Sequence, residues 1–528
     1  MTTRAFNLYM LTLILVVGLG SVLDVMEVDA AQYAGMSRDM LLNGDLLELH
    51  YRGEDYLDKP PLLFWLSALS FKIFGVHNWS YRLPSILFAF LGIYSTYRFA
   101  ALYHGKEAGR IAATMFGGSA AFILMTNDVR CDTILTSAVI TAIWAGCAWL
   151  VGGRTVHLVA CSVAIGAGLL VKGPIGAIAP AFALGAQLIH TKAWRKLLDP
   201  RLLLVPMIIL VMLLPMCIGL YEQFGMHGLR FYFWEQSFGR ITGENRWVDD
   251  SSVLFFTHEL PWQVLPWVVF VLAGIGWSVK DLFTERKEAE HASTAGALLV
   301  FAALSLSQFK LPHYLYVTLP LFAVVGAKAW LYQGRRLLIK IHYFLLALLW
   351  TLTLGFTWVV FPERNWPYLT LLILFLIGAI IYLRKEGGRA ALIPLSFGAI
   401  MIVGVFMNGH FYPNLLTYQA NAKVGQWVKE KELDEDHFYG LQVSGSALDH
   451  YAGFPVRWLS NAEEARTVIA PGVVIYTDAQ HVQELIDAGL DPVNTTHYHN
   501  YPVQLIGIDF LLPEQRRAVL EDRFVLEF

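Results

Sequence analysis

The stretch LLLVPMIILVMLLPMCIGL, residues 202–220, decides the class of fold, because it runs for 19 residues without a charged side chain. A helix of about 20 apolar residues is long enough to cross the hydrocarbon core of a bilayer. Similar runs recur from Leu8 to Met407, and the 528-residue chain is 56% hydrophobic and only 15% charged, with a mean hydropathy of +0.50. About a quarter of the residues in a soluble domain are charged. The sequence therefore predicts an all-α polytopic membrane protein.

Thirteen apolar segments are predicted to span the membrane. The shorter apolar segment 62–75, which contains Lys72, is predicted to lie at the membrane interface instead. The predicted spans are 6–23, 82–102, 109–127, 133–151, 155–171, 174–190, 202–220, 262–279, 293–307, 311–329, 339–361, 368–383 and 390–408.

Clusters of Lys and Arg recur in alternate connections between these spans, and they share one side of the membrane if the N-terminus is inside. The positive-inside rule assigns that side to the cytoplasm. The other side receives two long outer loops, 24–81 and 221–261, and, after thirteen spans, the C-terminal tail. We expect a bacterial inner-membrane protein with a cytoplasmic N-terminus and a periplasmic outer face.

The C-terminal tail differs in composition from the rest of the chain, so residues 1–408 are predicted as the transmembrane domain and residues 409–528 as a periplasmic α/β domain. Three stretches in the tail have the pattern of short strands and two have that of amphipathic helices. The strands are HFYGLQV, GVVIYTD and VQLIGID, and the helices are NAEEARTVIA and AQHVQELIDAG. The tail shows no phosphate loop, metal cluster or nucleophile elbow. We expect it to pack or to dock a partner.

Two acids, Glu27 and Asp29, directly follow the first span. An acid at the end of a span is often simply solvated. Here, however, Tyr33, Met36 and Met40 recur at helical spacing, which predicts an amphipathic helix along the membrane with Asp29 at its N-terminal end. A helix N-terminus stabilises a carboxylate in its ionised form, in which it can accept a proton.

Several cations lie in the predicted outer turns, although the positive-inside rule, which the rest of the chain follows, disfavours Lys and Arg there. Lys172 and Lys310 lie in short outer turns, and Lys59 lies in the stretch DYLDKPPLLFW. A single lysine at a span end usually extends to the interface, and that is the simpler interpretation of each one. Together they indicate a site for an anionic group such as a lipid-linked phosphate. Pro60 and Pro61 would hold Lys59 on an extended loop.

The ordered set of motifs D-x-x-x-Y-A, GD, DKPP, KGP, GR and S-x-x-KLP-x-Y, within residues 5–330, resembles the GT-C glycosyltransferases of the protein O-mannosyltransferase superfamily. The chain is most similar to the bacterial branch that includes the lipid A aminoarabinose transferases. The resemblance implies an inverting transfer of a sugar from a polyprenyl-phosphate donor at the outer face of the membrane. The C-terminal 120 residues or so contribute nothing to it.

The resemblance also assigns roles to residues. Asp29 matches the catalytic acid of the first outer loop, and Asp132 matches an acid of the second. Relatives often have a further acid directly after the first one, where this chain has Ala30, so Glu27 is a candidate substitute. The residues expected near the donor phosphate or on the cavity wall are Lys59, Lys172, Arg240, Lys310 and Tyr314.

These residues fit the chemistry of glycosyl transfer. Asp29 would act as a base toward an acceptor hydroxyl, and the cations would stabilise the departing phosphate. No metal is obligatory, although Asp29 and Asp132 could hold a divalent cation. The expected partners are a polyprenyl-phosphate sugar, membrane lipids and an acceptor that is a lipid A-like lipid, a protein or a glycan; nothing indicates nucleic acid. The alternatives are a transporter or flippase for lipid-linked glycans, and a glycan polymerase.

Overall fold

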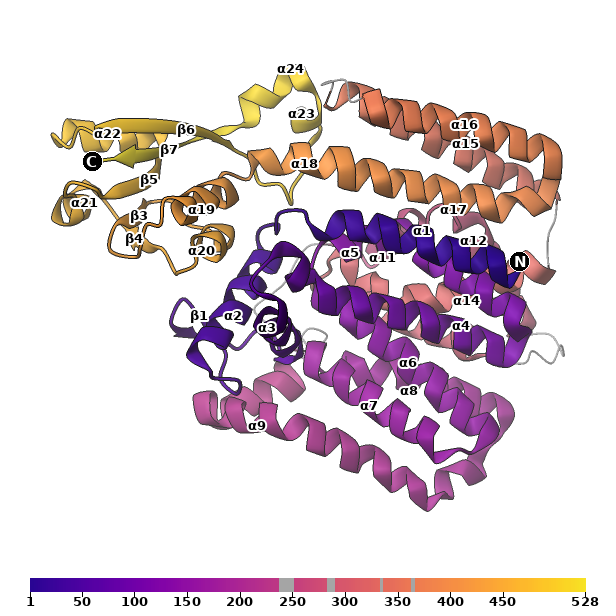
Figure 1. Cartoon of the computed structure of the whole chain (residues 1–528). Coiled ribbons are helices and arrows are strands. Elements are labelled where there is room, and N and C mark those ends of the chain that lie inside the picture. Colours follow the sequence, from indigo (N-terminus) through magenta and orange to yellow (C-terminus); the bar gives the residue numbers. More distant parts are fainter. Residues whose placement is uncertain (237–250, 283–289, 333–335, 362–365) are drawn as a thin grey trace.

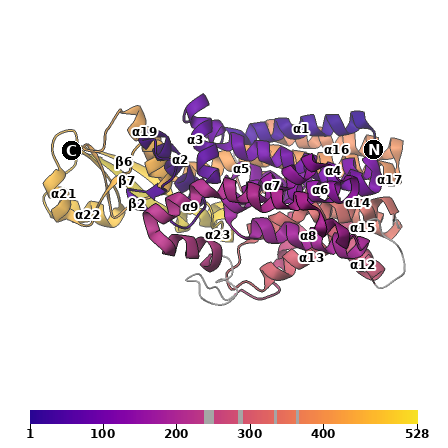
Figure 2. The same cartoon turned by 90° about the horizontal axis from the view of Figure 1, so that it is seen from below.

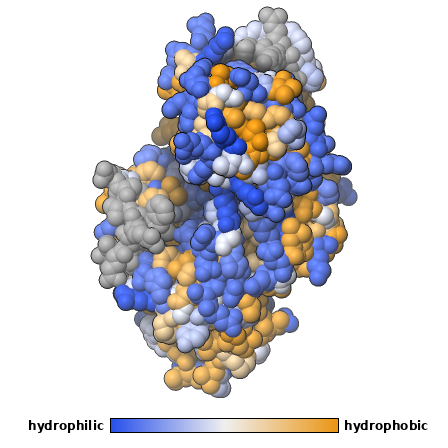
Figure 3. Space-filling model, turned by 90° about the vertical axis from the view of Figure 1, so that its left-hand side faces the viewer, coloured by the Kyte–Doolittle hydropathy of each residue, from blue (hydrophilic) through white to orange (hydrophobic). Residues whose placement is uncertain are grey.

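The computed structural model describes residues 1–236, 251–282, 290–332, 336–361 and 366–528 (Figure 1). Long helices run side by side through most of the molecule, and a small sheet lies at the end opposite the N-terminus; both views agree on this arrangement (Figures 1 and 2). At the end that carries the sheet, hydrophilic side chains predominate on the surface (Figure 3). The molecule thus consists of a helical body with a polar cap.

The helical body contains nine helices, among the described residues, that are long and apolar enough to cross a membrane. Each of the thirteen predicted spans lies mostly on helical residues, and the predicted fold class is confirmed. Long and short together, the described helices of the body are α1 (Thr3–Ser21), α4 (Asn78–Gly117), α5 (Ala120–Asn127), α6 (Cys131–Gly152), α7 (Thr155–Lys172), α8 (Ile175–Thr191), α9 (Leu204–Arg230), α11 (Phe255–Gln263), α12 (Val268–Leu282), α13 (Ala292–Ser305), α14 (Leu319–Tyr332), α15 (Arg336–Val359), α16 (Trp366–Glu386) and α17 (Gly388–Phe406).

Two predicted spans, 82–102 and 109–127, appear as one element because α4 continues through a break at Gly105. Gly105 has a φ of +85°, a left-handed conformation that glycine adopts without a steric penalty. The chain therefore reverses at this residue, and α5 completes the second span. A short π-helix, η3 (Phe231–Glu235), continues from α9, and a 3₁₀ helix, η4 (Pro312–Thr318), leads into α14.

The first outer loop folds into α2 (Asp29–Asn43), a two-stranded hairpin of β1 (His50–Tyr51) and β2 (Glu54–Asp55), and α3 (Leu62–Phe74). The predicted helix that begins at Asp29 is confirmed. It does not lie as an amphipathic helix on the surface, however. Tyr33, Met36 and Met40 are buried, and so is the polar Arg38, because α3 and the C-terminal domain cover α2.

The C-terminal domain holds a five-stranded sheet in the order β4-β3-β5-β7-β6. β3 pairs parallel with β4 and β5, and β7 pairs antiparallel with β5 and β6. Its strands are β3 (Phe438–Leu441), β4 (Arg457–Leu459), β5 (Val474–Asp478), β6 (Asn494–Asn500) and β7 (Glu521–Glu527). Its helices are α18 (Tyr412–Leu415), which continues from α17, α19 (Ala420–Glu430), α20 (Ser446–Ala452), α21 (Ala462–Val468), α22 (Ala479–Asp487), α23 (Ile508–Leu511) and α24 (Pro513–Arg516).

Four of the five elements predicted in this domain are confirmed, namely β3, β5, α21 and α22. The predicted strand VQLIGID is wrong. It follows Pro502, and Val503 packs with Tyr501 and Phe510 against Phe361 at the end of the helical body, so this segment is held there and not in the sheet. The sheet instead receives β6 and β7, whose sequences are more polar.

Candidate active site

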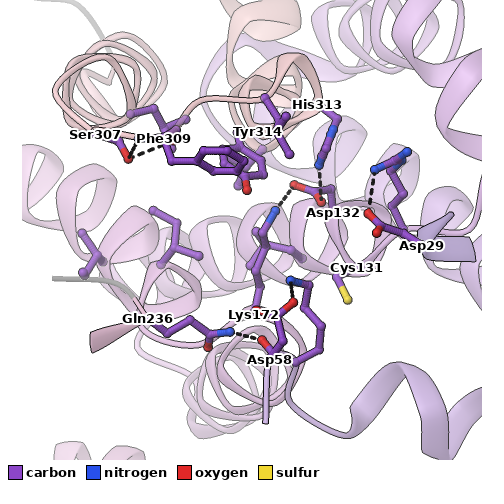
Figure 4. Close-up of a pocket in the computed structure, with 18 of the residues that line it drawn as sticks. Asp29, Asp58, Cys131, Asp132, Lys172, Gln236, Ser307, Phe309, His313 and Tyr314 are labelled. Carbon is purple, nitrogen blue, oxygen red and sulfur yellow. Dashed lines mark hydrogen bonds and ion pairs between the residues drawn. The ribbon is translucent and has the colours of Figure 1, made fainter. Parts of the chain in front are cut away.

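A cavity of about 430 Å³ lies where the start of α2, the loop before α3, the start of α6, the end of α7 and η4 meet (Figure 4). Among the described residues that line it are three carboxylates and three cations, and each carboxylate is paired with one cation. The pairs are Asp29 with Arg130, Asp58 with Lys59, and Asp132 with Lys172. The cavity is therefore strongly polar at one side without a large net charge.

Asp29 is the first residue of α2, and its side chain is 44% exposed at the cavity. Its Oδ2 atom lies 3.2 Å from Nη1 of Arg130, which also donates from Nε to Oδ2 of Asp128 at 2.5 Å. The helix N-terminus and the guanidinium both favour the ionised carboxylate. Because Asp29 is half-exposed, it remains accessible to an incoming hydroxyl group.

Asp132 and Lys172 form the most buried of the three pairs. The Lys172 Nζ atom donates to Asp132 Oδ1 at 2.6 Å, and the Asp132 side chain is only 4% exposed. His313 approaches the other carboxylate oxygen at 3.8 Å, and the Lys172 ammonium lies 4.1 Å from the centre of the Tyr314 ring. The acid and the ring thus fix the position of the lysine at the cavity wall.

Lys59 lies on the loop that the two prolines keep out of α3, which begins at Leu62. Its Nζ atom donates to Asp58 Oδ2 at 2.5 Å, and Gln236 donates to the backbone oxygen of Asp58. Burial, the largest single effect, lowers the pKa of Lys59, but the charge and hydrogen bond of Asp58 together with weaker neighbouring groups raise it, and the net shift is upward. The ammonium stays charged and has further donor hydrogens for a ligand.

The wall of the cavity beyond these ion pairs is apolar. It consists of Leu135, Ile175, Ile178, Phe182 and Leu304. The polar and apolar parts of the lining adjoin each other in one continuous space (Figure 4). Such a lining suits a molecule with an anionic head and a hydrocarbon tail.

Five of the eight candidate residues named from the sequence line this cavity: Asp29, Lys59, Asp132, Lys172 and Tyr314. Lys310 is not among the described lining residues, although its neighbours Phe309 and Leu311 are; its Nζ atom lies 3.1 Å from the backbone oxygen of Ser251. Arg240 lies outside the described residues.

Glu27, the eighth candidate, faces the C-terminal domain and not the cavity. Its Oε1 atom accepts a hydrogen bond from the backbone N–H of Ala447 at 2.9 Å, and both of its carboxylate oxygens accept from the Asn421 amide at 3.2 Å. Burial raises the pKa of Glu27 by more than these two donors lower it. The structure thus separates two acids that the sequence analysis had grouped.

Arg130, Asp58 and Gln236 also belong to the polar lining, and sequence reasoning did not select them as site residues. Arg130 stands in TNDVRCD between two acids, which is a common pattern for a solvated turn. Only the fold, which brings this turn next to the start of α2, shows that it contacts Asp29. The DKPP motif did mark the loop that carries Asp58.

The comparisons with known proteins show similarity to glycosyltransferases whose names include a lipid-linked sugar. A family model described as dolichyl-phosphate-mannose-protein mannosyltransferase matches residues 58–218. The resemblance to GT-C glycosyltransferases predicted from the sequence motifs is therefore confirmed.

The individual similar proteins have more specific names. The chain is 27% identical to an undecaprenyl phosphate-α-4-amino-4-deoxy-L-arabinose arabinosyl transferase of Pseudomonas aeruginosa, over 56% of this chain and 54% of that protein. The chain thus spans about half the length of that relative. A protein of the same name from Pseudomonas savastanoi is 25% identical, over 72% of each chain. The crystal structure of ArnT from Cupriavidus metallidurans bound to undecaprenyl phosphate shares the fold, with a TM-score of 0.75 and 18% identity over 99% of this chain and 98% of that one.

Proposed function

We propose that this protein is an integral membrane glycosyltransferase that moves a sugar from a polyprenyl-phosphate donor to an acceptor in the bacterial envelope. The observation that carries the proposal is the cavity, in which an accessible carboxylate, Asp29, shares one space with the ammonium groups of Lys59 and Lys172 and with an apolar wall. A volume of about 430 Å³ falls within the range of roughly 300–1,000 Å³ typical of small-ligand sites. The names of the similar proteins support the same donor class.

The proposed reaction is a single inverting displacement. Asp29 takes the proton from an acceptor hydroxyl as its oxygen forms a bond to the anomeric carbon of the sugar. The bond from that carbon to the phosphate oxygen breaks, and the polyprenyl phosphate leaves with the electron pair. General-base assistance of this kind contributes about 10²–10⁴ in rate. Arg130 holds the carboxylate of Asp29 in place through the contact of 3.2 Å.

Lys59 and Lys172 serve the leaving group. Negative charge grows on the phosphate as it departs, and fixed cations in a partly dehydrated cavity stabilise that charge. Asp132 positions Lys172 through the 2.6 Å hydrogen bond and does not act as a second base. Asp132 and Glu27 are thus given supporting roles, in contrast to the catalytic roles that the sequence suggested. The transfer needs no metal in this proposal, and EDTA is expected to leave its rate unchanged.

We further propose that the cavity and the C-terminal domain face the periplasm, with the N-terminus in the cytoplasm. The N-terminus lies at the end opposite the sheet (Figure 1). The connections rich in Lys and Arg, including those before Arg110 and around Lys196, belong to the same face as the N-terminus by the order of the spans. Donor and acceptor would then meet at the outer leaflet.

A transfer assay with the purified full chain in detergent tests this function. Lipid extract from the native host supplies both donor and acceptor, and mass spectrometry follows lipids and proteins. We expect an acceptor to gain the mass of one sugar, and we expect Lys59→Ala to remove that gain, with the exposed Lys385→Ala as matched control. No gain with folded protein and demonstrable donor would contradict the proposal and favour a transporter, whereas a ladder of products would indicate a polymerase.

A further inference from the structure

Three potential metal ligands lie together on the outer edge of the C-terminal sheet, away from the cavity. His497 and His499 are two residues apart on β6 and therefore project from the same face of the strand. Asp522 lies on β7, directly opposite His499 in the antiparallel register. The ligand atoms of the three side chains all lie within 4.8 Å of one another.

The carboxylate lies between the two imidazole rings. Asp522 Oδ1 is 2.7 Å from His497 Nε2 and 3.2 Å from His499 Nδ1. Tetrahedral zinc places such ligands about 2.0–2.2 Å from the metal, which separates neighbouring ligand atoms by roughly 3.3 Å. The two His–Asp distances, 2.7 and 3.2 Å, are shorter than this separation, so rotations of the side chains must move the ligand atoms to admit a metal ion. The strand pairing holds both backbones in place for this.

The simpler interpretation is an ordinary pair of His–Asp hydrogen bonds on an exposed strand. Elsewhere in the domain His437 makes one such bond, 2.6 Å from Nδ1 to Asp434 Oδ1, with a single imidazole. The edge of β6 differs because two imidazoles converge on one carboxylate oxygen.

A second group of potential ligands in the described residues, Asp45, Glu48 and His50, is less suited to a metal. Asp45 Oδ1 already accepts the backbone N–H groups of Leu47 and Glu48, at 2.9 and 3.1 Å, so it closes a turn. The side-chain contacts of Asp522, by contrast, go to the two imidazoles. Metal binding at β6 and β7 would thus not disrupt the backbone.

We propose that His497, His499 and Asp522 bind a divalent transition-metal ion of the zinc class and thereby link β6 to β7. Two imidazoles with one carboxylate favour zinc, copper, nickel or iron over Mg²⁺ and Ca²⁺, which prefer oxygen ligands. Three protein ligands leave a fourth position for water. The exposed edge gives the ion direct access from solvent. This site is separate from the cavity and plays no part in the proposed transfer reaction.

Bound metal would stabilise the C-terminal domain, because the ion binds the paired strands and not the separated ones.

The test uses the full chain in detergent, stripped of metal and carrying no polyhistidine tag. Calorimetric titration with Zn²⁺ at pH 7.5 is expected to give one saturable site, with a parallel rise in melting temperature. His497→Ala and His499→Ala are each expected to weaken binding by at least about 10-fold, since loss of an outer-shell partner alone costs that much. His437→Ala is the matched control and should bind like the wild type.

Three results would overturn the proposal. The first is that the wild type binds Zn²⁺ no more tightly than the variant that lacks both His497 and His499. The second is that His437→Ala weakens binding as much as His499→Ala does. The third is that a tenfold excess of Mg²⁺ displaces Zn²⁺. Each variant is compared by its affinity for the metal, and its melting transition shows that it remains folded. The outcome therefore does not depend on the transferase assay.

Discussion

Glu27 and Asp29 are separated by one residue, yet they belong to two different regions of the molecule. Asp29 points into the cavity, where its partner is the charged Arg130. Glu27 points into the joint between the helical body and the C-terminal domain, where its partners are the neutral donors of Asn421 and Ala447. The chemical role of an acid here depends on what the fold places opposite it.

The joint contains many contacts besides those of Glu27. Tyr451 accepts the backbone N–H of Val25 at 2.7 Å, and Gln419 accepts that of Glu27 at 2.9 Å. Arg38 of α2 donates to the backbone oxygen of Asp449 at 2.7 Å. The C-terminal domain therefore holds both ends of the segment that carries Asp29. We infer that one region performs the chemistry while the other fixes the position of the base.

The largest effect on folding is expected in the cavity, from Lys172→Met. This change leaves the carboxylate of Asp132 buried without its partner at 2.6 Å. Breaking a buried pair from one side costs about 3–5 kcal/mol, and we expect the lower end of that range because the cavity admits water. Chemical unfolding in detergent measures the loss. The exposed Lys385→Met is the control, and equal stability of the two variants would show that the pair is dispensable.

The next largest effect belongs to the joint. Glu27→Ala removes the acceptor from the Ala447 N–H and from the Asn421 amide. A buried donor without a partner costs about 1–3 kcal/mol, so unfolding should become easier and the amide of Ala447 should exchange faster with deuterium. Glu54→Ala, on the exposed hairpin, should change neither. If Glu27→Ala keeps full stability but loses transfer, Glu27 belongs to the chemistry after all.

A smaller effect is expected at the ion pair between Arg52 and Asp449, whose Nε and Oδ2 atoms are 2.6 Å apart. Arg52 is partly exposed, so the pair should contribute only about 1 kcal/mol. A double-mutant cycle with Arg52→Met and Asp449→Asn isolates this coupling energy. Asn can still accept the Val456 N–H, which Asp449 accepts now. A coupling near zero would mean that the joint does not depend on this pair.

The smallest effect concerns pH. Burial raises the pKa of Glu27 in the folded protein above the ordinary value of 4.5. The folded state therefore holds this proton more tightly than the unfolded state, and the contribution of Glu27 to stability is larger at low pH and declines as the pH rises through the folded pKa. Deuterium exchange at Ala447, corrected for its intrinsic rate, should be slower at pH 4.5 than at pH 7.5. Glu27→Gln should flatten this difference, and an unflattened slope would assign it to another group.

The sequence was sufficient to predict the helical body, because the spans are long and uncharged and the membrane requires them to be helical. It also placed Asp29, Lys59 and Lys172 at one cavity, since the family motifs fix their order along the chain. It did not indicate the partners of these residues. Arg130 reaches Asp29 only because the turn before α6 folds beside α2, a tertiary contact that spacing does not encode.

The errors in the C-terminal domain have a related cause. VQLIGID has the apolar character of a strand, but the nearby end of the helical body offers an apolar surface on which Val503 packs. The strand β6, NTTHYHN, is polar because it lies at an exposed edge, so hydrophobic periodicity did not detect it. The cluster of His497, His499 and Asp522 was also missed, because Asp522 is distant in sequence and meets the two histidines only through the pairing of β6 with β7.

The rate of sugar transfer by Asp29→Asn, relative to the wild type, tests the central claim most directly. The two proteins are compared at equal folded fraction, as judged by their melting transitions, with the donor lipid in excess. We predict a fall of about 10²–10⁴ with unchanged stability, because Asn keeps the size of the side chain but cannot accept the proton. Transfer by Asp29→Asn at the wild-type rate would contradict the assignment of this residue as the base.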